Sequence, residues 1–299
     1  MKIILDTDIG DDVDDAFALL LALNTPRLEI LGVTTAYRNA PLRAKIAAYL
    51  IRSAGKTVPV YVGASYPLGQ DILRFDYEKI GADGLPIIRQ YYDYMSDEKV
   101  ETKPAAEFIR ECADEYPDEI TLVSLGPLTN VATVLDRYPE SFAKLDRLVI
   151  MGGELAAKQA EWNLRLDAVA AAKVLLAGKQ ITLVPLEATR PCVIDETAMR
   201  EFDGITSPGM TALRPLLTAW KENFGKNLKC TMHDPLAVSL LTENFCEKQT
   251  RRLRVKTDGE KPGLLEETAA GAEITCAVNT DAKAFMRYFI DRLKGDEVC

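Results

Sequence analysis

Short runs of β-branched and aliphatic residues alternate with helix-length amphipathic stretches along the whole chain. This alternation is typical of βαβ units, in which parallel strands form one sheet and helices cover its two faces. We predict strands at 2–6, 28–35, 58–62, 120–124, 146–151 and 181–186. Apolar residues recur with helical spacing at about 13–24, 40–54, 104–116, 128–137 and 167–178. The sequence therefore predicts an α/β fold with an open, mostly parallel sheet flanked by helices.

The length of 299 residues is compatible with one domain, because open α/β folds often reach this size. Hydrophobic residues make up 47% of the chain and charged residues 27%, which is ordinary for a globular enzyme with a large core. We therefore expect a single domain over residues 1–299 with two less regular parts. These are a loop-rich insertion at about 64–103 and an irregular helical region at about 193–232.

The charge and cysteine content restrict the partners of the chain. A net charge of -9 without a Lys or Arg cluster disfavours nucleic acid, whose phosphates are neutralised by such clusters. The six cysteines are scattered and form no CxxC pair, which favours a reducing compartment. The N-terminal apolar run is too short for a signal peptide, and no segment reaches the roughly 20 apolar residues of a membrane span. We expect a cytoplasmic protein that binds a small molecule and neither a membrane nor nucleic acid.

An acidic cluster follows the first predicted strand, at the sheet edge where open α/β folds place their ligands. Within ten positions it contains Asp6, Asp8, Asp11, Asp12, Asp14 and Asp15. So many carboxylates repel one another unless a cation or protons compensate, and hard divalent cations prefer oxygen ligands. The alternative is structural, because aspartates commonly cap helix N-termini. An EF-hand is excluded, since the loop lacks a glycine at its sixth position and an acid at its twelfth.

Several segments along the chain carry motifs in a fixed order. They are DTDIGDDVDDAFAL, VTTAYRN, LVSLGPLTNVA, VIMGG followed by EWN, and MHDPLAV. Together they resemble the signature segments of the inosine-uridine preferring nucleoside hydrolase family, over nearly the whole chain. The resemblance implies a Rossmann-like nucleoside hydrolase fold. It also implies hydrolysis of the N-glycosidic bond of ribonucleosides to free ribose and nucleobase, in purine and pyrimidine salvage.

The resemblance also implies a metal site and two catalytic groups. Its ligands to Ca²⁺ would be Asp8, Asp15, the carbonyl of Leu125 and Asp234. Asp8 would take a proton from the attacking water as general base. His233, the single histidine, would donate to the departing base. The family further suggests a homo-oligomer, either a dimer or a tetramer.

The same resemblance implies which residues bind the nucleoside. The substrate-binding residues would be Asp14, Asn39, Met151, Glu161 and Asn163. Two asparagines and Asp14 would hold the 2′ and 3′ hydroxyls of the ribose, and Glu161 the 5′ hydroxyl. The transition state would carry positive charge on the sugar, which anionic groups stabilise.

Three departures from the family pattern leave the substrate and the activity open. The spacing between DxDxG and the following DD is two residues longer, the loop from Met151 to Glu161 is short and contains no asparagine, and residues 79–86 contain no histidine. A related riboside is therefore an alternative substrate. A haloacid dehalogenase-like phosphatase, which also begins with DxD after a strand, is a second alternative, and a non-catalytic ribose-binding homologue is a third. Base preference stays open, although Tyr91, Tyr92, Trp220 and Phe224 could stack on a base.

Overall fold

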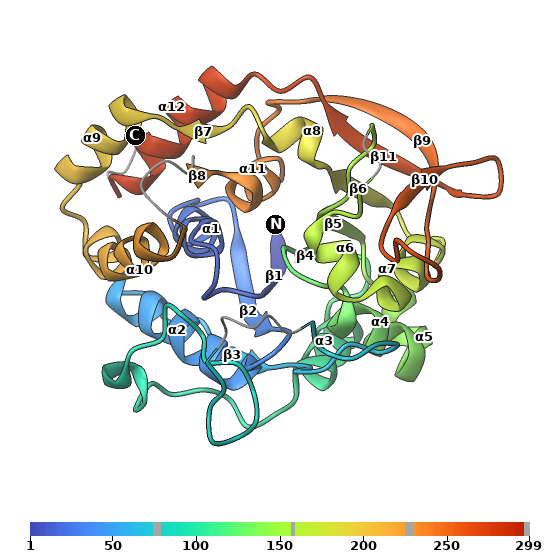
Figure 1. Cartoon of the computed structure of the whole chain (residues 1–299), viewed down its shortest axis with the longest axis horizontal. Coiled ribbons are helices and arrows are strands. Elements are labelled where there is room, and N and C mark those ends of the chain that lie inside the picture. The colour runs from blue at the N-terminus through green and yellow to red at the C-terminus, as the bar shows by residue number, and fades with distance from the viewer. Residues whose placement is uncertain (74–78, 157–158, 225–229, 296–299) are drawn as a thin grey trace.

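The computed structural model describes residues 1–73, 79–156, 159–224 and 230–295 (Figure 1). Within these residues one sheet has the strand order β10-β9-β11-β6-β5-β4-β1-β2-β3, and a small second sheet pairs β7 with β8. The strands are β1 (Lys2–Thr7), β2 (Glu29–Thr35), β3 (Val60–Val62), β4 (Ile120–Ser124), β5 (Arg147–Met151), β6 (Ile181–Val184), β7 (Val193–Ile194), β8 (Cys230–Thr231), β9 (Glu247–Val255), β10 (Leu265–Glu267) and β11 (Ala272–Val278).

The helices alternate with these strands as the sequence predicts. They are α1 (Asp14–Leu23), α2 (Ala40–Ser53), α3 (Ala105–Glu115), α4 (Thr129–Arg137), α5 (Pro139–Ala143), α6 (Trp162–Leu166), α7 (Ala168–Leu175), α8 (Leu186–Thr189), α9 (Glu196–Gly204), α10 (Pro208–Phe224), α11 (His233–Ser239), α12 (Ala282–Leu293) and the 3-10 helix η1 (Asp93–Met95). In the described part of the chain, no helix is long and apolar enough to span a membrane.

The main sheet is mostly parallel. From β3 through β2, β1, β4, β5 and β6 to β11, neighbouring strands pair in parallel, whereas β9 and β10 are antiparallel to their neighbours. The predicted fold class, a single-domain open sheet flanked by helices, is confirmed. The antiparallel edge was not predicted, because β9 is rich in charge and largely exposed. Its arginines instead pair across strands, as between Arg252 and Glu273 at 2.7 Å.

Successive residues of the central strand point to opposite faces, and both faces are buried. Ile3 and Leu5 of β1 belong to the core covered by α1, α2, α10, α11 and α12, whereas Ile4 belongs to the core covered by α3, α4 and α7. Figure 1 shows α1 and α11 beside β1, and these two helices pack against each other. The strand ends that carry the acidic cluster are therefore held from both sides of the sheet.

The two less regular regions differ from each other. Residues 64–103 contain η1 and isolated bridges in their described part, and backbone N–H of Leu68 anchors them by donating to buried Asp167 at 2.8 Å. Residues 193–232 contain β7, α9, α10 and β8, and Pro215 lies inside α10. A proline inside a helix removes one backbone hydrogen bond, so the hydrogen-bond pattern of α10 is interrupted there.

A buried polar network lies at the carboxyl end of β1. Asp6 accepts hydrogen bonds from the Thr34 hydroxyl at 2.6 Å and from the Asn130 amide at 2.7 Å. Asn130 also donates to the Thr35 carbonyl at 3.0 Å and accepts from the backbone N–H of Ala64 at 2.9 Å. Burial raises the pKa of Asp6 to about 6, although these hydrogen bonds oppose the rise. The hydrogen bonds of Asp6 therefore connect the end of β1 to β2 and α4.

Candidate active site

A cavity of about 480 Å³ opens at the carboxyl edge of the parallel strands. Its walls come from the loops after β1, β2, β4 and β5, from the insertion, and from the first residues of α6, α8 and α11. The lining residues are Asp8, Asp11, Asp12, Asp14, Asp15, Arg38, Arg89, Leu125, Met151, Glu161, Trp162, Asn163, Leu186, His233 and Asp234. The cavity thus gathers residues from all five sequence motifs.

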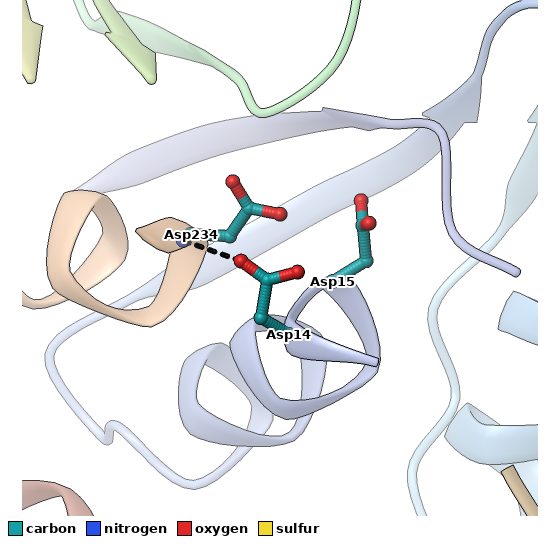
Figure 2. A group of neighbouring side chains, drawn as sticks. All are labelled: Asp14, Asp15 and Asp234. Atoms are coloured by element: carbon teal, nitrogen blue, oxygen red, sulfur yellow. Dashed lines mark hydrogen bonds between the residues drawn. The ribbon is translucent and has the colours of Figure 1, made fainter. Parts of the chain in front are cut away.

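Three buried carboxylates converge in this cavity. Asp14 and Asp15 come from the first turn of α1 and Asp234 from the first turn of α11, as Figure 2 shows. One oxygen of each lies within 4.8 Å of the others. The backbone N–H of Asp234 donates to Asp14 Oδ2 at 3.2 Å, and the Thr7 hydroxyl donates to Asp15. Burial first, and then mutual repulsion, raises the pKa of all three carboxyls well above the ordinary range.

The trio fits a hard divalent cation. Oxygens bound to one calcium ion at about 2.3–2.6 Å can lie up to roughly 5 Å apart, and the three carboxylate oxygens satisfy this limit. A cation would also cancel the repulsion that raises their pKa values. Asp15 and Asp234 are predicted ligands, whereas Asp14 was predicted to contact the sugar. The helix dipole at the start of α1 favours negative charge there, but it does not explain why α11 contributes a third carboxylate.

Asp8 lies next to this trio, just beyond the end of β1. It is partly exposed to the cavity, and it raises the pKa of both Asp15 and Asp234 by repulsion. Burial raises the pKa of Asp8 itself to about 6, against the opposing effect of Arg43. With this pKa, Asp8 is mostly ionised at neutral pH, which is the state a general base requires.

The glycine of the GPLTN segment allows the loops after β1 and β4 to approach each other closely. A Cβ at position 126 would lie 2.6 Å from Asp8 Oδ1.

A fully buried arginine, Arg43 of α2, holds the acidic loop from below. Its guanidinium donates to the carbonyls of Tyr37 at 2.9 Å, Ile9 at 3.0 Å and Asp8, and to Asp11 Oδ2 at 2.7 Å. This residue was not predicted. The sequence could have indicated it, because Arg43 is a charged residue on the apolar face of a predicted helix, the face that also carries Ile46, Ala47 and Leu50.

We expect Arg43→Met to destabilise the fold by about 3–5 kcal/mol, because it leaves buried acceptors and the Asp11 carboxylate without their donor. Urea unfolding measures the change. Arg52→Met is the matched control, because Arg52 lies on the same helix and its exposed side chain pairs with Glu98. Its loss should cost at most about 1 kcal/mol. Equal effects of the two substitutions would contradict the role given to Arg43.

The Leu125 carbonyl and the EWN segment form one hydrogen-bonded wall. Asn163 Nδ2 donates to the Leu125 carbonyl at 2.7 Å and to the Met151 carbonyl at 3.3 Å. Glu161 is the N-cap of α6 and accepts from the backbone N–H groups of Asn163, Leu164 and Gly153. Burial raises the pKa of Glu161, and these bonds counteract the rise. All four predicted residues of these segments line the cavity, with Leu125 oriented by Asn163.

Asn39 is placed differently from the other predicted site residues. Its side chain caps α2 by accepting from the backbone N–H of Leu42, and its amide donates to Asp83 Oδ2 at 2.8 Å. It does not belong to the described lining of the cavity. The capping role follows from its place directly before α2, and its contact with the sugar stays a prediction.

His233 lines the cavity beside Asp234. Its Nδ1 shares a hydrogen bond of 2.7 Å with the Thr189 hydroxyl. Burial first, and then the Arg190 cation, lowers the pKa of His233 to about 4. The imidazole is therefore uncharged at neutral pH, and it can act on a leaving group as an N–H hydrogen-bond donor.

Four further lining residues were not predicted, namely Arg38, Arg89, Trp162 and Leu186. Arg38 and Arg89 bring positive charge to the cavity, and Arg38 Nη1 lies 3.8 Å from Asp11 Oδ2. Trp162 stands between Glu161 and Asn163, and its place inside the EWN motif could have indicated that it lines the site.

The described aromatic residues that could stack on a base lie outside the lining of the cavity. Trp220 belongs to the core, and Tyr91 and Tyr92 pack against it. The side chain of Phe224 and residues 225–229 lie outside what the structure describes.

The family model described as inosine-uridine preferring nucleoside hydrolase matches residues 3–287. The chain belongs to this family. It is therefore a nucleoside hydrolase, an enzyme that hydrolyses N-ribosyl bonds. The phosphatase alternative is excluded by this assignment.

Relatives and solved structures agree with the family assignment. Uridine nucleosidase 1 of Arabidopsis thaliana is 31% identical over 270 residues, which cover 86% of this chain and 79% of the relative. Non-specific ribonucleoside hydrolase RihC of Klebsiella pneumoniae is 33% identical over 249 residues, covering 81% and 79%. A solved plant nucleoside hydrolase, PpNRh1, superposes with a TM-score of 0.80 at 26% identity, covering 98% of each chain. The fold of a ribonucleoside hydrolase from Gardnerella vaginalis is also similar, with a TM-score of 0.82 at 23% identity and coverage of 99% and 98%.

Proposed function

We propose that this nucleoside hydrolase depends on Ca²⁺ and cleaves the N-glycosidic bond of ribonucleosides to free ribose and nucleobase. The observation that supports the proposal is the convergence of Asp14, Asp15 and Asp234 beside Asp8 in one cavity. Buried carboxylates repel one another at neutral pH, so this arrangement is favourable chiefly when a cation is present. The diol of a ribose supplies the neutral oxygens that a calcium shell accepts in addition to carboxylates.

The proposed calcium ligands are Asp8, Asp15, Asp234 and the carbonyl of Leu125. When bound, the cation supplies a Lewis acid that polarises water and the sugar hydroxyls. We assign Asp14 to a sugar hydroxyl, as the family resemblance implies, and its Oδ2 is oriented by the backbone N–H of Asp234. Asn163 holds the Leu125 carbonyl in place and extends the same wall toward the sugar.

The reaction requires a base, stabilisation of positive charge and help for the leaving group. Asp8 accepts a proton from the water that attacks the anomeric carbon. The surrounding carboxylates stabilise the positive charge that develops on the ribose ring. Glu161 and Met151 line the end of the cavity that receives the 5′ carbon, and His233 donates a hydrogen bond to the departing base.

Removal of the imidazole is expected to matter most for poor leaving groups. His233→Ala should slow inosine hydrolysis by about 10²-fold or more, and should slow an activated 4-nitrophenyl riboside by less than about tenfold. Between pH 6 and 8 the wild-type rate should show no step from this residue, because the pKa of His233 is lowered to about 4. Steady-state rates of the two substrates measure the effect. Equal losses on both would argue against a role at the leaving group.

The proposed activity is tested by incubating the protein with inosine, uridine or adenosine in excess Ca²⁺. Free ribose is assayed as reducing sugar, the base by chromatography, and inorganic phosphate as a negative control. We expect equal amounts of ribose and base from at least one nucleoside. If the protein binds these nucleosides with calcium but releases no sugar, it is a non-catalytic homologue. If it releases sugar only from other ribosides, its substrate is a related riboside.

We further propose that the enzyme acts in the cytoplasm, in purine and pyrimidine salvage, as a homodimer or homotetramer. The cysteine state is consistent with a reducing compartment, since the described cysteines are all buried and free. They are Cys112, Cys192, Cys230, Cys246 and Cys276. Size-exclusion chromatography with light scattering tests the oligomer.

A further inference from the structure

Trp162 stands out among the residues that line the cavity. It is 42% exposed, although it lies between two residues that are each only 6% exposed, Glu161 and Asn163. Apart from the imidazole of His233, it is the one aromatic ring in the described lining. An exposed indole at a cavity wall offers a large apolar surface that a ligand can cover.

The polar neighbours of Trp162 are engaged with the protein itself. Glu161 accepts three backbone N–H groups, which occupy three of the roughly four acceptor positions of a carboxylate. Asn163 uses its amide on the carbonyls of Leu125 and Met151. Most of the carboxylate of Glu161 and both N–H groups of the Asn163 amide are therefore used within the protein.

The described residues of the loop before α6, between Gly152 and Ala160, contribute no side chain to the lining of the cavity. Its polar contacts point elsewhere, because Glu154 pairs with Arg190 and the backbone N–H of Ala156 donates to Glu187. Apolar Met151 and Leu186 line the same cavity as Trp162. Both lie near the neighbours of Trp162, because the Met151 carbonyl accepts from Asn163 and the backbone N–H of Leu186 donates at 2.9 Å to the carbonyl of Gly153, whose own N–H donates to Glu161.

We propose that Trp162, together with Met151 and Leu186, forms a subsite for an apolar substituent on the 5′ carbon of the riboside. The inference rests on the proposed function, which places the 5′ carbon near Glu161. The favoured substrates then include ribosides whose 5′ hydroxyl is replaced by hydrogen or by a small thioether. A methylthio group covers apolar surface of the indole, and sulfur contacts with aromatic rings are favourable.

The test compares a matched series on one base: uridine, 5′-deoxyuridine and 5′-deoxy-5′-methylthiouridine, with the corresponding inosine series in parallel. For the wild-type chain, we expect kcat/KM of the methylthio compound to be at least about one third of that of the parent. Trp162→Ala should lower the ratio of methylthio to parent kcat/KM about tenfold, mainly through KM. Trp162→Phe, which keeps a ring, should restore the ratio to within about threefold of wild type.

A control substitution and a binding measurement complete the design. Tyr94 is 54% exposed and stacks on Tyr92 away from this cavity, so Tyr94→Ala should leave the ratio unchanged. If no sugar is released, calorimetry with Ca²⁺ can measure the dissociation constants of the same compounds instead. The ratio of affinities for the methylthio compound and its parent then tests the subsite separately from the proposed catalysis. An unchanged ratio in Trp162→Ala, or exclusion of the methylthio compound by a chain that binds the parent, would overturn the inference.

Discussion

The Asp8→Ala variant is expected to release ribose at least about 10⁴-fold more slowly than the wild-type chain, with the fold intact. The substitution removes the residue that we propose as general base, a function worth about 10²–10⁴-fold, and also one of the carboxylates proposed to hold the cation. Ribose release at saturating nucleoside and excess Ca²⁺ measures the loss, and circular dichroism checks the fold.

Two controls separate the functions of Asp8. Asp8→Asn keeps an oxygen that can coordinate the cation but removes the base, so calcium affinity should fall less than in Asp8→Ala while turnover stays low. Asp136→Ala removes an exposed carboxylate that pairs with Lys173 far from the cavity, and should not change turnover. Normal turnover in Asp8→Ala would remove the assignment of the base.

Chelation of divalent cations should reduce ribose release to background, and added Ca²⁺ should restore it. Since the cation binds the folded chain, a concentration about 100 times its Kd stabilises the fold by about 2.7 kcal/mol. For a chain of this size, that corresponds to a rise in Tm of roughly 5 °C. Calorimetry with Ca²⁺, Mg²⁺ and no cation measures it. Full activity after exhaustive chelation would contradict the proposed dependence.

The calcium effect on stability should increase with pH. Burial and mutual repulsion raise the pKa values of Asp14, Asp15 and Asp234 in the cation-free fold. Protonation therefore stabilises that fold at a pH below about 4, and this contribution is lost as the pH rises through the raised values. The cation replaces the protons. The difference in Tm with and without Ca²⁺ should thus be small at pH 5 and largest near pH 8.

The local pattern of the sequence was sufficient for the parallel part of the fold. Strands such as β4 (Ile120–Ser124) are buried at every position and rich in aliphatic residues, because both faces of the sheet are covered, and their ends were predicted closely. β9 was not predicted by the same pattern. Its exposed arginines pair with glutamates of β10 and β11, and such pairs depend on strand register, which a short sequence window does not reveal.

The candidate site also contains residues that the local sequence pattern could predict and residues that it could not. Asp15, Asp234 and Glu161 could be placed because each lies in a motif next to a strand or helix end, where topology brings the loops together. The hydrogen bond from Asn39 to Asp83 and the positions of Arg38 and Arg89 in the cavity could not be predicted, because they depend on side-chain directions in loops from distant segments. The position of Trp162 on the cavity wall could not be predicted, because it depends on which neighbouring side chains point into the protein.

The guanidinium beneath the acidic loop affects the order in which the enzyme assembles. Arg43 is a permanent positive charge in contact with the backbone of Asp8 and the carboxylate of Asp11, so part of the repulsion is offset by the polypeptide alone. We therefore expect Arg43 to reduce the amount of cation binding that the fold itself requires. Under the proposed Ca²⁺ dependence, a shortage of the ion would then lower activity at concentrations that still leave the chain folded.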